Sequence, residues 1–225
     1  MSADLHIVSS CVISNFVVYK NEKPVFENTK EDVAGFLLSV YRYLGLQYPK
    51  FYKMDNLSKL GWIAAEFLLK GEFGADEYRP EEIGIVLANS SASLDTDIKY
   101  YETVKSIASP SLFVYTLPNI MIGEICIKNN IKGENAFFVF DHFDINFIKD
   151  YVSHLLQHDI LKICICGWVE LLDENYKAVL FLVEKAVSAE FPASKTSATE
   201  AGMHSEGISQ RVLFTEENIN KIYQS

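Results

Sequence analysis

Apolar and polar residues alternate along the chain in two patterns. Short continuous apolar runs, which are typical of strands buried on both faces, occupy residues 83–88, 137–140, 160–166 and 178–183. A β-branched segment at 6–18 predicts a further strand or hairpin near the start of the chain. Apolar residues at helical spacing predict helices at 57–71, 97–107 and 120–130. One more helix is predicted after residue 140, with apolar side chains on one side at Ile145, Ile148, Val152 and Leu155.

Strands that alternate with helices are typical of a layered α/β domain. The order of these elements predicts a five-stranded, mostly parallel sheet flanked by helices. The end of the chain differs, because residues 192–210 are rich in Ser, Thr, Ala and Gly and show no sustained periodicity. Thr215 then precedes Glu217 and predicts the cap of a short terminal helix. We therefore expect one domain at 1–190, followed by a flexible segment and a short helix at 191–225.

Composition favours a soluble globular domain. Hydrophobic residues make up 49% of the chain and charged residues 22%, which is enough to build one substantial core. No apolar run approaches the roughly 18 residues of a membrane span, and the first residues lack the basic flank of a signal peptide. We therefore expect a cytoplasmic protein that does not contact a membrane.

Charge and cysteine usage narrow the choice of partners. The net charge of −10 argues against nucleic acid, and also against this chain alone docking an acidic carrier protein. The four cysteines lie in apolar patterns without zinc-ligand spacing, so they are expected to be small buried hydrophobes: Cys11, Cys126, Cys164 and Cys166. We expect neither a metal nor a cofactor.

The most informative stretch runs from Ser109 to Glu170. It contains a Ser-Pro pair, a Leu-Pro-Asn turn within TLPNIMIGEICIKNNIKG, a strand-like AFFVF segment and the sequence GWVE. This stretch resembles the first half of a β-ketoacyl synthase, the thiolase-fold enzyme that condenses acyl units. Weaker likenesses at 51–71, 87–97 and 179–186 extend the resemblance to about residues 5–188. The resemblance implies a thiolase-like layered fold, present here as a single half.

The residue that carries the family's chemistry is missing. Aligned without gaps from Gly133, the family's nucleophilic cysteine falls on His142, and the family's Gly-Gly-x-Glu falls on Gly167 to Glu170. A helix N-terminus lowers the pKa of a thiol and stabilises an oxyanion, but it disfavours an imidazolium. His142 is therefore expected to be a packed or hydrogen-bonded residue, with Asp141 and Asp144 capping the helix; an alternative role as nucleophile or base stays open.

The resemblance also implies two catalytic histidines in a second half of the fold. The other histidines of this chain do not match them: His6, His154, His158 and His204. We therefore expect no condensing activity from the chain alone. The implied function is that of a non-catalytic, chain-length-factor-type subunit, which pairs with an active β-ketoacyl-ACP synthase in fatty-acid, polyketide or aryl polyene pigment biosynthesis.

The resemblance further implies where partners would bind. The dimer interface would be the strand of Ala136, Phe137, Phe138, Val139 and Phe140. The border of the shared acyl tunnel would be Pro118, Asn119, Met121 and Ile122, although Met121 could equally be core filler. The expected partners are an active ketosynthase and, through it, an acyl carrier protein, with a homodimer possible when the chain is alone.

Two other functions stay open. The chain could be a hydrolase or decarboxylase that uses His142 on acyl thioesters, or a purely structural interaction module.

Overall fold

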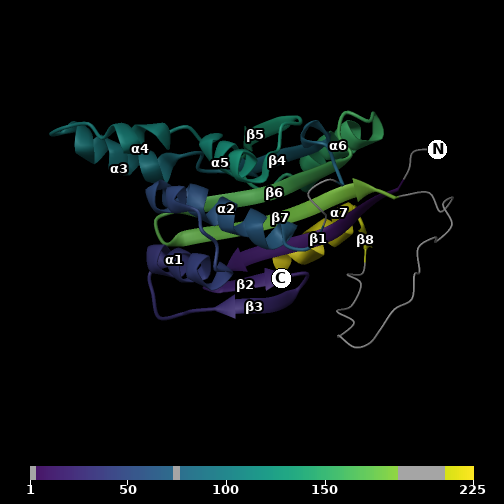
Figure 1. Ribbon diagram of the computed structural model, residues 1–225, viewed down its shortest axis with the longest axis horizontal. Helices are drawn as coiled ribbons and strands as arrows, with labels where there is room; N and C mark the ends of the chain where they lie inside the picture. Colours follow the sequence, from purple (N-terminus) through teal and green to yellow (C-terminus); the bar gives the residue numbers. More distant parts are fainter. Residues whose placement is uncertain (1–3, 73–76, 187–210) are drawn as a thin grey trace.

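The computed structural model describes residues 4–72, 77–186 and 211–225 (Figure 1). Its strands form one mixed eight-stranded sheet in the order β3-β2-β1-β7-β6-β4-β5, with β8 added to β1. Their bounds are β1 Leu5–Ser14, β2 Val17–Lys20, β3 Lys23–Glu27, β4 Ile83–Asn89, β5 Asn135–Val139, β6 Ile163–Leu172, β7 Asn175–Lys185 and β8 Val212–Leu213.

The prediction of a five-stranded, mostly parallel sheet is wrong. Among the described strands only β4 pairs parallel, with β5 and with β6, and every other pair is antiparallel. The reason is that two-residue turns, not helices, join β1 to β2, β2 to β3 and β6 to β7. Each turn starts with an Asn or Asp at positive φ, at Asn15, Asn21 and Asp173, as tight antiparallel hairpins require.

Helices cover both faces of the sheet. Their bounds are α1 Val33–Leu44, α2 Asn56–Leu69, α3 Leu94–Val104, α4 Pro110–Val114, α5 Ile120–Asn129, α6 Ile145–Gln157 and α7 Glu216–Gln224, with short 3-10 helices at Pro49–Lys53 and Pro80–Glu82. Side chains of α1, α2 and α5 form one apolar core with one face of the sheet, and side chains of α6 and α7 form a second core with the other. Strand β6 alternates between the two cores, with Ile165 in the first and Cys166 in the second.

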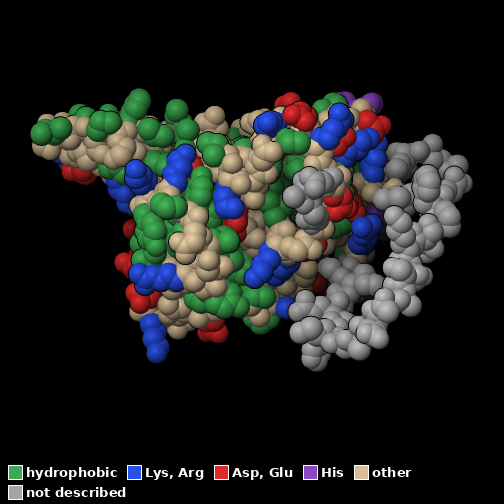
Figure 2. All heavy atoms as spheres, viewed as in Figure 1, with side chains coloured by type: hydrophobic (Ala, Val, Ile, Leu, Met, Phe, Trp, Pro, Cys, Tyr) green, Lys and Arg blue, Asp and Glu red, His purple; other side chains and the backbone are tan. Residues whose placement is uncertain are grey.

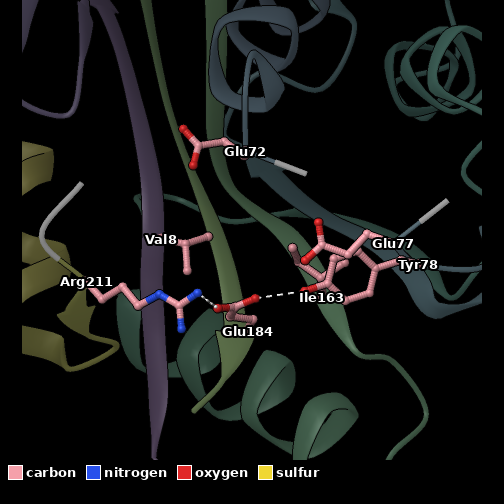
Figure 3. A pocket seen from close by; sticks show the side chains of 7 residues that line it. All are labelled: Val8, Glu72, Glu77, Tyr78, Ile163, Glu184 and Arg211. Atoms are coloured by element: carbon pink, nitrogen blue, oxygen red, sulfur yellow. Dashed lines mark hydrogen bonds and ion pairs between the residues drawn. The ribbon is translucent and has the colours of Figure 1, made fainter. Parts of the chain in front are cut away.

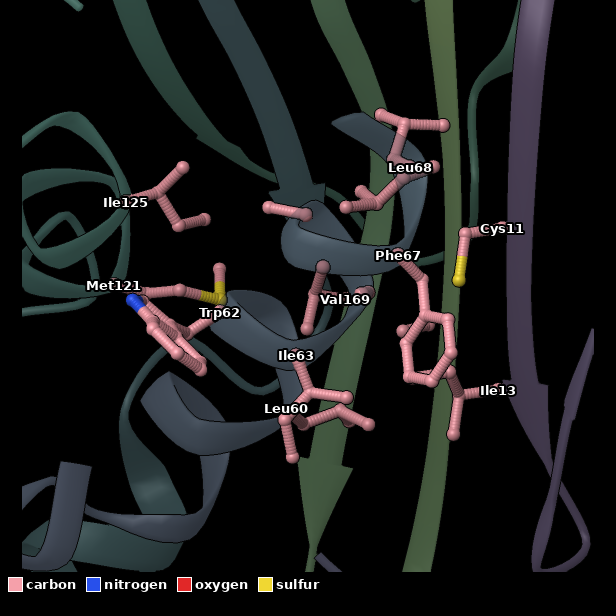
Figure 4. Packing of buried hydrophobic residues seen from close by; sticks show 14 of the residues in the cluster. Cys11, Ile13, Leu60, Trp62, Ile63, Phe67, Leu68, Met121, Ile125 and Val169 are labelled. Atoms are coloured by element: carbon pink, nitrogen blue, oxygen red, sulfur yellow. The ribbon is translucent and has the colours of Figure 1, made fainter. Parts of the chain in front are cut away.

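Helix α2 lies at the centre of the first core and is apolar nearly all round (Figure 4). It begins at its cap Asp55, whose carboxylate accepts a hydrogen bond from the N–H of Ser58 at 2.9 Å. Gly61 lets α5 approach closely, because a Cβ at that position would lie 2.1 Å from Sδ of Met121. Helices α2 and α5 therefore pack closely against each other within the first core.

The predicted elements are mostly observed. A hairpin occupies the first segment, and β4, β6 and β7 are buried strands, although β6 begins at Ile163 and runs on to Leu172 rather than spanning 160–166. The prediction that residues 137–140 form a strand buried on both faces is wrong, since β5 lies at the sheet edge and is only partly buried. Helix α3 begins three residues before the predicted start, and α1 was not among the predicted helices.

The C-terminal helix α7 is confirmed, and Thr215 caps it by accepting a hydrogen bond from the N–H of Asn218. The predicted flexible segment, residues 192–210, lies outside the described residues. Cys11, Cys164 and Cys166 are fully buried, Cys126 is half-buried, and all four are free thiols, as expected of small hydrophobes. Within the described ranges, no helix is long and apolar enough to cross a membrane.

Candidate functional site

Strand β5 forms one open edge of the sheet. It pairs with β4 on one side, and no described strand pairs with its other side. Phe138 turns toward α6, where its ring contacts those of Phe147 and Tyr151 at 4.8 and 5.4 Å between centroids. Val139 is 52% exposed. The outer side of the predicted interface strand is thus apolar and accessible, and no described strand covers it.

The opposite edge of the sheet is protected against pairing. Strand β3 carries Lys23, Pro24 and Glu27, and charges and proline on an edge strand oppose the addition of another strand. Strand β5 reads Asn-Ala-Phe-Phe-Val and has neither charge nor proline. The contrast within one sheet indicates that the β5 edge is available for pairing and the β3 edge is not.

The loop after β5 brings His142 to the surface. His142 is exposed and, among the described residues, has no hydrogen bond or ion pair, so the expectation of a packed or hydrogen-bonded histidine is wrong. Its neighbour Phe143 takes the buried position instead, with ring contacts to Trp168 at 5.7 Å and to Tyr223 at 5.0 Å.

The N-terminus of α6 is occupied by its own cap. The carboxylate of Asp144 accepts a hydrogen bond from the N–H of Phe147 at 2.9 Å, as the sequence predicted, and Asp141 adds a second nearby negative charge. A thiolate or an oxyanion needs free N–H groups and a positive potential at such a place. In this chain the same place carries the negative charges of Asp141 and Asp144.

The Leu-Pro-Asn turn leads into α5. Pro118 is half-buried and Asn119 is exposed, whereas Met121 and Ile122 are 1% and 3% exposed in the first core. Figure 4 shows Met121 beside Trp62 and near Ile125. The four predicted tunnel residues thus divide into two at the turn and two inside the protein's own core.

Sequence reasoning missed a buried carboxylate three residues after Met121. Glu124 is 3% exposed, accepts a hydrogen bond from the Tyr115 hydroxyl at 3.2 Å and forms an ion pair with Nζ of Lys50 at 2.8 Å. Burial, together with the neighbouring Glu124 carboxylate, raises the pKa of Tyr115. The sequence does contain a signal for a buried carboxylate, because Glu124 is the single acid in the apolar segment IMIGEICI.

The GWVE motif lies inside β6 rather than at its end. Glu170 accepts hydrogen bonds from the N–H and the hydroxyl of Ser90, each at 2.6 Å, and from the N–H of Ser91 at 3.3 Å. These bonds fasten the loop that joins β4 to α3. The role of Glu170 in this chain is therefore to position that loop.

A hollow of about 190 Å³ lies between the end of α2 and the sheet (Figure 3). Its central group is Glu184, which is 8% exposed, accepts a hydrogen bond from the Tyr78 hydroxyl at 2.9 Å and pairs with Arg211 at 2.9 Å. Glu72, in the same hollow, pairs with Lys20 at 2.9 Å. Both carboxylates therefore have partners within the chain. The ion pair of Glu184 with Arg211 holds the start of the C-terminal segment, next to β8, against the sheet.

No metal centre is formed by the residues that the structure describes, because they contain no group of three or more His, Cys, Asp or Glu side chains able to hold an ion. The absence of a cofactor stays a prediction.

Comparison with known proteins gives a likeness in fold. No protein-family model and no curated protein matches the sequence. Among solved structures, the ishigamide ketosynthase/chain length factor is similar with a TM-score of 0.61 and 17% identity, over 84% of this chain and 64% of that one. A ketosynthase in complex with its chain length factor from Xenorhabdus doucetiae gives a TM-score of 0.55 and 14% identity, over 82% of this chain and 80% of that one.

A β-ketoacyl synthase from Burkholderia phymatum is also similar, with a TM-score of 0.55, 10% identity, and coverage of 82% of this chain and 59% of that one. The chain thus spans less than two thirds of the length of the ishigamide protein and of the Burkholderia synthase. At these identities the likeness concerns the fold. The eight-stranded mixed sheet flanked by helices has the architecture of a ketosynthase half-domain, shared with ketosynthase and chain length factor structures.

Proposed function

We propose that this chain is a non-catalytic, chain-length-factor-type subunit that pairs with an active β-ketoacyl-ACP synthase in fatty-acid, polyketide or aryl polyene pigment biosynthesis. The observation that carries the proposal is strand β5, which is an unprotected apolar edge in a sheet whose other edge is blocked. An edge of this kind calls for a covering strand. Ketosynthase and chain length factor complexes are among the structures that share the fold.

The loop beside β5 supports a subunit without its own chemistry. The position aligned with the family nucleophile holds an exposed histidine, and a carboxylate already occupies the following helix N-terminus. The acyl thioester would therefore react in the partner's site, and an acyl carrier protein would reach the complex through the partner. The net charge of −10 is consistent with this arrangement, since acidic carriers are repelled by an acidic surface.

The pairing is tested by a substitution at the open edge. Val139→Lys places a charge on an exposed position of β5 without removing a core side chain, so it should weaken association with the ketosynthase encoded by a neighbouring gene. Glu27→Lys is the matched control, because it puts the same side chain on the opposite edge. Co-expression followed by size-exclusion chromatography and titration should show weaker association for Val139→Lys alone.

Two results would count against the proposal. One is a wild-type chain that binds no ketosynthase, and the other is a Val139→Lys variant that binds as tightly as wild type. Phe138→Lys should also weaken association, but it removes the ring contacts with α6 as well. A thermal melt of this variant is therefore needed to separate weaker association from loss of stability.

Met121 and Ile122, with Pro118 and Asn119 at the turn before them, are proposed to border the acyl tunnel of the complex. Met121→Trp should shorten the product made by the reconstituted complex if the residue reaches the tunnel. If Met121 only fills the core, the larger ring should lower the free energy of unfolding by roughly 1–3 kcal/mol through overpacking and leave product length unchanged. Product analysis by mass spectrometry distinguishes the two.

A further inference from the structure

Helix α6 ends in two histidines that lie on the same face. His154 and His158 are four residues apart, and the N–H of His158 donates to the carbonyl of His154 at 3.1 Å, so the turn between them is helical. Side chains at this spacing lie one above the other on a helix. The centroids of the two rings are 4.4 Å apart, with the ring planes at 50°. The two imidazoles are therefore in contact.

Both rings are exposed, and Figure 2 shows histidine side chains at the surface over α6. Within the described part of the chain, neither ring forms a hydrogen bond or an ion pair. The neighbouring carboxylate of Asp159 is held instead by Lys162 and Lys185, at 2.7 and 2.8 Å. The ring nitrogens of the histidine pair are therefore available to an external ligand.

Two neutral imidazoles one helical turn apart can chelate a transition-metal ion. Imidazole nitrogen suits Zn²⁺, Ni²⁺ and Cu²⁺, whereas Mg²⁺ and Ca²⁺ prefer oxygen ligands. Histidines at positions i and i+4 of a helix supply two such nitrogens from one face. With bonds of about 2.0–2.1 Å to a tetrahedral Zn²⁺, the two nitrogens would lie roughly 3.3 Å apart. Rings that are already in contact can reach this separation by side-chain rotation, without a change in the backbone.

We propose that His154 and His158 form a chelating site for a divalent transition-metal cation of the Zn²⁺ and Ni²⁺ class. Two side chains are fewer than the three or four protein ligands of a resident zinc centre, so the ion is exchangeable and water fills its remaining positions. The net charge of −10 favours the approach of a cation. The site lies at the far end of α6 from the loop of His142, and it does not depend on pairing with a ketosynthase.

The bound ion would act on the last turn of α6. Both ligands lie in that turn, and the spacing that lets them share one ion exists only while the turn is helical. The inner side of the same turn carries Leu155 and Leu156, which are buried in the second core. A ligand that binds the folded chain more tightly than the unfolded chain stabilises the fold. The ion should therefore raise the melting temperature of the protein.

The test is a calorimetric titration of the untagged protein with ZnCl₂, followed by thermal melts with and without the ion. His154→Gln and His158→Gln each leave one imidazole and change an exposed side chain, so both should fold as wild type by circular dichroism. Each should weaken the affinity for Zn²⁺ at least about tenfold, because the second bond of a chelate forms at a high effective concentration. His142→Gln is the matched control, since it removes an exposed imidazole outside the pair, and its affinity should stay within about twofold of wild type.

Nuclear magnetic resonance of the imidazole nitrogens shows directly which rings bind the ion. On addition of Zn²⁺, the resonances of His154 and His158 should shift together and those of His142 should not. The inference is overturned if the two variants of the pair bind Zn²⁺ as tightly as wild type, or if His142→Gln loses as much affinity as they do. It is also overturned if Mg²⁺ competes as well as Zn²⁺, because carboxylates would then hold the ion.

Discussion

At the scale of single residues, backbone geometry at the centre of the sheet depends on Gly167. Its φ is +148°, and a Cβ built on it would lie 2.0 Å from the backbone oxygen of Val179 on the neighbouring strand. Such a contact cannot be relieved by turning a side chain. A glycine is therefore required at this position by the close approach of β6 and β7.

Gly167→Ala should lower the free energy of unfolding by about 2–4 kcal/mol, because it combines backbone strain with a clash against main chain. The control is Gly123→Ala in α5, where no atom lies within 4 Å of the added Cβ. That change should raise stability by about 0.5–1 kcal/mol through helix propensity. Urea titrations of the two variants provide the measurement, and equal stabilities would contradict the role assigned to Gly167.

At the scale of elements, the C-terminal segment completes the second core. Helix α7 buries Ile219 and Ile222 beside α6, and β8 pairs with β1. Lys177 on β7 donates to the backbone carbonyl of Tyr223 near the helix C-terminus and lies 4.4 Å from the centroid of its ring. Burial lowers the pKa of Lys177. A segment that follows a stretch of low periodicity is thus fastened to the sheet by packing, pairing and a lysine cap.

Ile219→Ala should cost about 2–4 kcal/mol of stability, since Ile219 is 1% exposed and the site would be left as a cavity. Asn220→Ala, at the next and exposed position of the same helix, should change stability by less than about 0.5 kcal/mol. Thermal melts decide the point. If Ile219→Ala melts with wild type, α7 does not contribute to the core in the way described.

At the level of the whole molecule, helices cover both faces of one sheet, while no described element covers the outer edge of β5 or the exposed apolar side chains of residues 94–117. The large exposed apolar side chains are concentrated in residues 94–117, which hold eight of those found in the described chain. The two cores are therefore well packed, whereas part of the surface still exposes apolar side chains that a partner could bury.

The chain alone should transfer no acyl group. Incubated with acyl-carrier thioesters, the wild-type protein should show no added mass by intact-protein mass spectrometry, whereas an active ketosynthase run beside it should be acylated. His142→Cys should also stay unmodified, because Asp144 already occupies the N–H of Phe147 and the nearby carboxylates oppose a thiolate. Acylation of either form would mean that the loop after β5 can support the chemistry.

Local features of the fold could be read from the sequence. Periodicity identified α2, α5 and α6 and the buried strands β4, β6 and β7, because the spacing of apolar residues is set by element geometry alone. The cap at Thr215 and the burial of Cys11, Cys164 and Cys166 were equally readable. Each of these depends on residues close together in the chain.

The pairing of elements and the surfaces left open depend on contacts between residues far apart in the chain. The backbone of Phe16 donates to the hydroxyl of Tyr176, 160 residues away, and no local pattern predicts such a neighbour. For the same reason the antiparallel pairing of β1 with β7 and the partnership of Glu124 with Lys50 were not predicted. The apolar residues of α3 have the spacing of a core-facing helix. Only the polar side of α3, which is buried and bonded to Asp55 and Asp173, shows that these apolar residues face outward: Leu94, Ile98, Tyr101 and Val104. A pattern of apolar residues specifies that a face is to be buried, and long-range packing decides whether this chain or another one buries it.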